Sequence, residues 1–207
     1  MIELARWQQL WQRLTGLQPA EHWWTELQQQ YSAPQRAYHT LQHLAECLQH
    51  FDAVRALLPH PDAVEAALWA HDVIYDTHRH DNEAASAAWV QQLLQETAAP
   101  PATIQQVTDL IGLTKHVAEP VDEDGAYLLD IDLAILGAAP VRFAEYEQQV
   151  RQEYHWVAWP AFCTGRAQIL QSFLQRPTIY RTPFFQAKFE AQARTNLAAS
   201  LHNLTQS

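Results

Sequence analysis

Apolar residues recur every three or four positions along most of the chain, which is the spacing that places them on one face of an α-helix. Leu41, Leu44, Leu48 and Phe51 show this spacing, and similar stripes run through most of the sequence. No stretch shows the strict alternation of apolar and polar residues that is typical of a strand. The pattern therefore predicts an all-α protein.

Prolines mark where these helices begin and end. The sequence has 11 prolines and five glycines, and Pro59-His60-Pro61 and Pro100-Pro101 each interrupt the helical spacing. The predicted helices span residues 1–15, 20–31, 37–58, 61–76, 81–97, 101–116, 124–137, 140–155, 159–175 and 183–204. No repeat or linker divides the chain, so we expect one domain over residues 1–207, a bundle of about ten helices.

Composition narrows the class of protein. The chain has 207 residues, and 48% of them are hydrophobic, which is enough for one large core. The net charge of -10, from 13 Lys and Arg against 23 Asp and Glu, argues against a surface that binds nucleic acid or an anionic membrane leaflet. A small ligand is the expected partner, and a homodimer is compatible with the sequence.

The cysteines, the N-terminus and the lengths of the apolar segments indicate where in the cell the protein is expected. Cys47 and Cys163 stand far apart, so we expect neither a disulfide framework nor a thiolate zinc site, and both are interpreted as small buried core residues. The N-terminus lacks a cationic start followed by an apolar run, and no segment approaches the roughly 20 apolar residues of a membrane helix. The sequence therefore predicts a cytoplasmic protein with no membrane partner.

Two segments bring imidazole groups to predicted helix faces. His39 and His43 stand four residues apart, so on one helix they would project from the same face. His71 continues the apolar stripe of its predicted helix and is expected to point inward, with Asp72 on the flank. A buried His beside a carboxylate is unfavourable unless it is paired or bound to a metal.

A third segment adds carboxylates. Asp130 and Asp132 interrupt a strongly apolar helix and lie on different faces of it, so at least one needs a buried partner. Neutral imidazoles mixed with carboxylates suit a divalent ion such as Mn, Fe, Co, Ni, Zn or Mg, and the lack of paired thiolates disfavours a closed structural zinc site. Metal-bound water ionises near neutral pH far more readily than bulk water. The segments together predict an open, catalytic metal site.

In order and spacing these residues resemble the HD-domain superfamily of metal-dependent phosphohydrolases, which have a His on one helix, a His-Asp pair on a second and an Asp on a third. The resemblance implies four metal ligands: His43, His71, Asp72 and Asp132. Asp132 is preferred to Asp130 because the last Asp of the family precedes a hydrophobic helical run, here residues 133–136. A single ion is favoured, since the additional histidine ligands of two-metal members are not clearly matched.

The motif Tyr38-His39-x-x-x-His43 also resembles that of cyclic-nucleotide phosphodiesterases, in which the first His is a general acid and the second a metal ligand. By this resemblance His39 is the acid. A narrower likeness, to a bacterial subfamily of predicted HD phosphohydrolases, covers residues 38–43, 70–76, 82–87, 130–137 and 190–197. The superfamily includes nucleotidases, cyclic-nucleotide phosphodiesterases, alarmone hydrolases and di-iron oxygenases, so the resemblance leaves the substrate open.

Five residues near these motifs are further candidates. Asp76 and Glu83 are expected to orient the attacking water or to hold a ligand histidine. Arg36 and Lys115 are candidates for binding a substrate phosphate, although cations at helix ends also interact with the helix dipole. His116 is a candidate for binding a second metal or for facing the phosphate, and the alternative is that it caps a helix C-terminus.

The sequence thus predicts a metal-dependent phosphohydrolase that acts on a small phosphorylated metabolite, with a nucleotide as the expected substrate. The metal would polarise a phosphoryl oxygen and lower the pKa of a bound water, while His39 would protonate the leaving oxygen and Asp72 would help to take the proton of the water. Two alternatives stay open: a catalytically inactive HD protein that binds a nucleotide, and a di-iron oxygenase, which needs more histidine ligands than the motifs supply.

Overall fold

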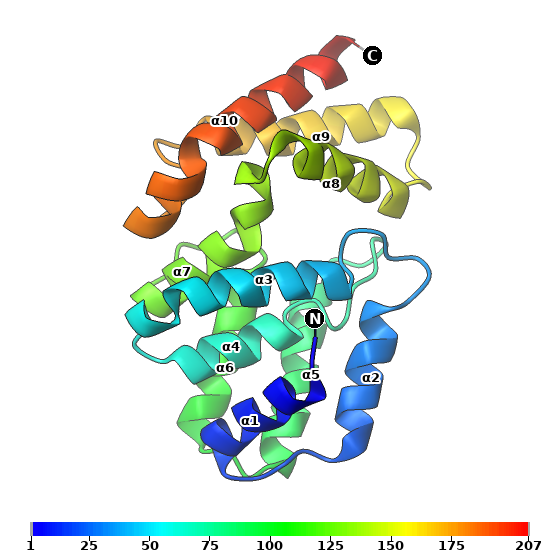
Figure 1. The fold of residues 1–207 in the computed structure, drawn as a ribbon. Helices are drawn as coiled ribbons and strands as arrows, with labels where there is room; N and C mark the ends of the chain where they lie inside the picture. Colours follow the sequence, from blue (N-terminus) through cyan, green and yellow to red (C-terminus); the bar gives the residue numbers. More distant parts are fainter. Residues whose placement is uncertain (1, 207) are drawn as a thin grey trace. The chain divides into compact units, whose positions relative to one another are not determined.

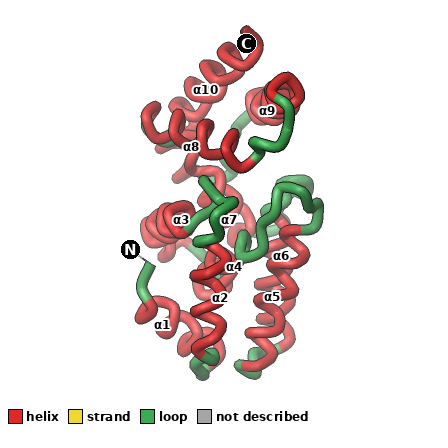
Figure 2. The backbone as a smooth tube through the Cα atoms, turned by 90° about the vertical axis from the view of Figure 1, so that its right-hand side faces the viewer, coloured by secondary structure: helices red, strands yellow, loops and turns green. Residues whose placement is uncertain are grey.

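The computed structural model describes residues 2–206, and this part of the chain contains helices and loops but no strand (Figure 2). It has ten α-helices and two 3-10 helices, so the prediction of an all-α protein is confirmed. None of the described helices is both long and apolar enough to cross a membrane. The chain forms two compact units, Met1–Asp132 and Leu133–Ser207, and the expectation of a single domain stays a prediction.

The first unit is built around helix α4. Its elements are α1 (Leu4–Thr15), α2 (Glu21–Tyr31), α3 (Leu41–Val54), η1 (Arg55–Leu57), α4 (Pro61–Ala70), α5 (Asn82–Glu96), α6 (Pro101–Leu113) and α7 (Glu123–Asp132) (Figure 1). Helix α4 packs against α1, α3, α5, α6 and α7, and every residue from 63 to 70 is buried. A helix that is buried on all sides lies in the core, and α4 therefore delivers the residues that follow it to the interior.

Tryptophans fill the core beside α4. Trp69 contacts Trp7 and Trp24 edge to face, with ring centroids 5.4 and 6.0 Å apart, and Trp7 contacts Trp11 at 5.0 Å. Trp7, Trp11 and Trp69 are at most 1% exposed. These contacts hold α1 and α2 against the helix that leads to His71.

Helix α3 begins later than the sequence pattern predicts. The expected helix starts at residue 37, whereas the observed one starts at Leu41. Thr40 is the N-cap, and its hydroxyl accepts a hydrogen bond from the amide of Gln42 at 3.3 Å, which is the usual role of a threonine at a helix start. His39 therefore precedes the helix instead of belonging to its first turn.

Helix α4 ends earlier than expected, at Ala70 instead of residue 76. The carbonyls of Asp72 and Val73, which would continue the helix, accept hydrogen bonds from the guanidinium of Arg36 at 2.6 and 2.8 Å. The hydroxyl of Ser86 pairs with the backbone just beyond this point. Side chains from other segments thus replace the helical hydrogen bonds, which the local apolar pattern does not reveal.

The second unit consists of η2 (Leu133–Gly137), α8 (Pro140–Glu153), α9 (Trp159–Leu174) and α10 (Pro183–Gln206). The helix predicted for residues 124–137 is therefore α-helical only as far as Asp132 and continues as a 3-10 helix. Helix α10 packs against α9 and η2, and Asn196 donates to the carbonyls of Leu136 and Ala138 at 2.9 Å each. A Cβ at Gly137 would lie 2.6 Å from the Cβ of Phe189, so only glycine allows this close approach.

Candidate metal centre

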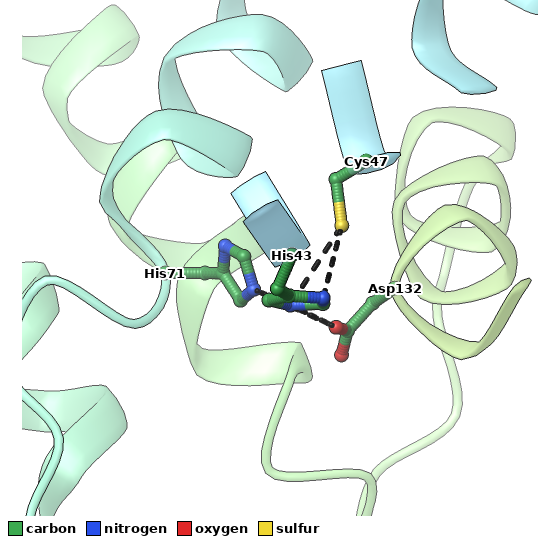
Figure 3. A group of neighbouring side chains, drawn as sticks. All are labelled: His43, Cys47, His71 and Asp132. Atoms are coloured by element: carbon green, nitrogen blue, oxygen red, sulfur yellow. Dashed lines mark hydrogen bonds and ion pairs between the residues drawn. The ribbon is translucent and has the colours of Figure 1, made fainter. Parts of the chain in front are cut away.

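Four of the predicted site residues converge in the first unit. His43 comes from α3, His71 and Asp72 follow α4, and Asp132 ends α7. The side chains of His43, His71 and Asp132 point toward one another (Figure 3). The two histidines are 2% and 1% exposed, whereas the side chains of Asp72 and Asp132 are 17% and 14% exposed. The group is therefore buried at its imidazoles and open to solvent at its carboxylates.

The Nε2 atoms of His43 and His71 lie 3.0–3.5 Å from each other and from the nearest oxygens of Asp72 and Asp132. His43 Nε2 is 3.1 Å from His71 Nε2 and 3.3 Å from Asp132 Oδ1. Asp72 Oδ2 is 3.0 Å from His71 Nε2 and 3.5 Å from His43 Nε2. Two ligands at ~2.1 Å from one ion lie about 3.0 Å apart at a right angle and about 3.4 Å apart at the tetrahedral angle. The separations fit donors that share a single divalent ion.

The orientation of His71 is set by its other ring nitrogen. Nδ1 lies 2.9 Å from the carbonyl oxygen of Leu68, and because a carbonyl only accepts, Nδ1 carries the hydrogen. In the neutral ring this leaves a lone pair on Nε2, directed at the carboxylates. Histidines that bind metals are commonly oriented in this way.

The imidazoles and carboxylates of the group shift one another's pKa values. Burial by itself would lower the pKa of His71, but the charge of Asp72 beside it raises that pKa well above its usual value, and the pKa of His43 is raised against the same effect of burial. Burial would raise the pKa of Asp132, but the hydrogen bond from His116 and those from the two ligand histidines lower it well below its usual range. The acids are therefore ionised, and a bound cation would take the place of protons on the imidazoles.

Cys47 is a neighbour of this group that the sequence reasoning did not assign to it. The prediction that both cysteines are buried is confirmed, but Cys47 Sγ also lies 3.7 Å from both ring nitrogens of His43. A sulfur equally far from both nitrogens lies beside the ring, so an ion ~2.1 Å from Nε2 in the ring plane would be more than about 4 Å from it. The spacing His43-x-x-x-Cys47 on one helix is the signal that could have identified it.

His39 also lies near the group, although it does not share a helix with His43. Its ring is half-buried, stacks on Tyr75 with the centroids 3.9 Å apart, and lies 5.8 Å from the ring of His43. The charge of His39 contributes, after that of His71, to lowering the pKa of Asp72 against the opposing effect of burial. The predicted proximity is present, but loop geometry produces it.

Arg36 lies within this region and faces the backbone. It is 6% exposed, and its guanidinium donates to the carbonyls of His39, Asp72 and Val73 at 3.0, 2.6 and 2.8 Å. The same group lies over the ring of Tyr31, 5.0 Å from its centroid. Arg36 therefore connects the segment that precedes α3 to the segment that follows α4.

The remaining candidates take different positions. Asp76 is exposed, and its carboxylate accepts from the amide of His78 within its own loop. Within residues 2–206, no hydrogen bond or ion pair joins Asp76 or Glu83 to the donor atoms above. Lys115 is exposed and donates to the carbonyl of His80 at 3.3 Å. Neither Asp76 nor Glu83 therefore holds a ligand histidine among the described residues, and their role in orienting the attacking water stays a prediction.

The last helix of the unit contains both candidate aspartates. Asp130 is completely buried and lies outside the group of donor atoms, whereas Asp132 lies within it. Two imidazoles and two carboxylates around one point can bind a divalent ion and leave coordination positions for water and substrate. Comparison of the chain with protein-family models, with curated proteins and with solved structures gives no match.

Proposed function

We propose that this chain is a metal-dependent phosphohydrolase of the HD type, acting on a small phosphorylated metabolite, with nucleotides as the favoured class. The observation that carries the proposal is the convergence of two buried imidazoles and two carboxylates, with each imidazole Nε2 within 3.0–3.5 Å of the other and of both carboxylates. The order of these residues along the chain resembles that of HD-domain phosphohydrolases, and this resemblance supplies the reaction.

Four residues would hold the ion: His43, His71, Asp72 and Asp132. When bound, a divalent ion supplies positive charge for a phosphoryl oxygen and makes water easier to deprotonate. The partly exposed carboxylates lie on the side that a phosphate ester can reach. The buried histidines keep the opposite side dry, and the hydrogen bond from His71 Nδ1 to Leu68 prevents the ring from turning.

Proton transfers fall to residues at the edge of the group. His39 is half-buried and stacked on Tyr75, which leaves its ring in one orientation beside the ligands. Protonated His39 donates to the leaving oxygen, and the exposed edge of Asp72 accepts a proton from the attacking water. Arg36 bonds to the backbone carbonyls of both residues, so it fixes the distance between acid and base.

The test is to purify the protein, measure its metal content and screen nucleotides and other phosphate esters with Mn, Co, Ni, Zn or Mg. The matched variants are Asp132→Asn and Asp109→Asn. Both neutralise one carboxylate, but Asp109 lies on the exposed face of α6 and bonds to Gln105. We expect Asp132→Asn to lose metal and activity, and Asp109→Asn to keep both.

Two results would contradict the proposal. One is the absence of phosphate release from every ester with every metal by a protein that binds metal and is folded. The other is full turnover by Asp132→Asn, because a residue whose loss changes nothing does not hold the ion.

A further inference from the structure

His116 makes an unusual connection to the metal centre. Its Nε2 lies 3.0 Å from Asp132 Oδ2, while the other oxygen of the same carboxylate, Oδ1, lies 3.3 Å from His43 Nε2 and 3.5 Å from His71 Nε2. The two oxygens of Asp132 therefore face different partners. A carboxylate held in this way offers one oxygen to an ion, and its hydrogen bond to His116 opposes a rotation that would offer both.

The two ring nitrogens of His116 have different surroundings. A carboxylate oxygen only accepts, so Nε2 carries a hydrogen. Nδ1 is buried and has no hydrogen-bond partner among the described residues. Nε2 thus faces the carboxylate of Asp132, and the expectation that His116 binds a second metal or faces the phosphate stays a prediction.

The backbone of His116 is strained. Its φ is 56°, a left-handed conformation that side chains other than glycine rarely adopt, and among the described residues Ala98 is the other non-glycine with a positive φ. The residue follows α6, with its amide bonded to the carbonyl of Leu113 at 2.9 Å. Strained residues are often maintained where a side chain must reach a particular position. Here the strained backbone carries the imidazole to Asp132.

We infer that His116 is a positioning residue of the metal centre: its Nε2–H holds Asp132 Oδ2, so that Oδ1 alone faces the two ligand histidines. The inference rests on the metal centre of the proposed function and is independent of the reaction catalysed there. Groups that orient a metal ligand in this manner typically change metal affinity by about 10–100-fold when they are removed.

Three substitutions separate the hydrogen bond from the backbone strain. His116→Ala removes the donor and keeps the strain, His116→Gly removes both, and His116→Gln retains an N–H donor at the same number of bonds from Cβ. His80→Ala is the control, because His80 is an exposed histidine in the neighbouring loop and the hydrogen bond that it accepts from Lys115 is made by its backbone carbonyl, which the substitution keeps.

The measurements are the affinity for Zn²⁺ or Co²⁺, by competition with a chelator, and the melting temperature of the metal-free protein. We expect His116→Ala and His116→Gly to bind the ion about 10–100-fold more weakly, and His116→Gln to recover most of that loss. Metal-free His116→Gly should melt higher than His116→Ala by about 2–4 °C, because glycine relieves the strain. His80→Ala should bind as the wild type does.

Wild-type affinity in His116→Ala would overturn the positioning role, and so would a His116→Gln variant that binds no better than His116→Ala. If His116→Ala does not fold, the comparison of His116→Gly with His116→Gln decides the question in the same way. A wild type that binds no metal overturns the metal centre and this role together. A wild type that binds metal but hydrolyses no ester defeats only the proposed reaction.

Discussion

Replacing Arg36 by Ala should destabilise the protein strongly, because the guanidinium holds two chain segments together from a buried position. It donates to the carbonyls of His39, Asp72 and Val73, and the residue is 6% exposed. A hydrogen bond to a charged group contributes about 1.5–3 kcal/mol, so three correspond to roughly 4.5–9 kcal/mol. Water entering the vacated space would compensate for part of this, and we expect a loss of about 3–5 kcal/mol in the free energy of unfolding.

Urea unfolding of the metal-free protein, followed by circular dichroism, measures this loss. Arg36→Lys should fall between the wild type and Arg36→Ala, since one ammonium cannot reach three carbonyls. Arg79→Ala is the control, because Arg79 is exposed and pairs with Asp81 at the surface, so its loss should leave the midpoint unchanged.

The same experiment distinguishes two roles for Arg36. If Arg36 instead binds the substrate phosphate, its loss would raise KM and leave the midpoint of urea unfolding unchanged. If Arg36→Ala unfolds at the same urea concentration as the wild type, then Arg36 does not stabilise the protein by connecting the two segments, and phosphate binding gains support. A lower midpoint together with weaker metal binding would support the role of Arg36 in connecting the two segments.

Three further predictions concern packing and the ion. Gly137→Ala should lower the free energy of unfolding by about 1–3 kcal/mol, because the new Cβ would meet Phe189. Gly165→Ala should raise it by about 0.5–1 kcal/mol, because this glycine lies inside α9 with open space around its Cβ. Equal effects of the two substitutions on thermal unfolding would contradict the packing described. Zinc at about 100 times its Kd should raise the melting temperature by about 5–11 °C, and EDTA should reverse the shift. Metal affinity should fall as the pH is lowered, because the pKa values of His43 and His71 are raised in the metal-free protein and protons compete with the ion; calorimetry that detects no proton release on binding would refute this.

Much of the centre could be predicted from the sequence because its residues lie on or beside buried helices. The spacing of apolar residues in α4 correctly directs His71 inward. The preference for Asp132 over Asp130 comes from the resemblance to HD-domain proteins, and Asp132 is the aspartate that lies beside the histidines. Helical periodicity carries the information about His71, since a polar residue within a buried stripe is buried with it.

The positions outside the helices could not be predicted in the same way. Asp76 would stand one turn after Asp72 if α4 continued, but the helix ends at Ala70 and carries Asp76 into an exposed loop. Beyond this point the carbonyl of Asp72 accepts a hydrogen bond from Arg36, more than 30 positions earlier in the chain, and no local pattern contains such a contact. The link from His116 to Asp132 depends on a left-handed backbone in the loop after α6, which likewise has no periodic signal.

The distribution of tryptophans gives each unit its own optical signature. Trp7, Trp11 and Trp69 of the first unit are at most 1% exposed, whereas Trp156 and Trp159 of the second are 47% and 44% exposed. Indoles in a dry core emit at shorter wavelengths than indoles in water, and aqueous iodide quenches mainly the latter. The blue part of the fluorescence spectrum therefore follows the unit that contains the metal centre, and loss of its packing can be watched separately from that of the other unit.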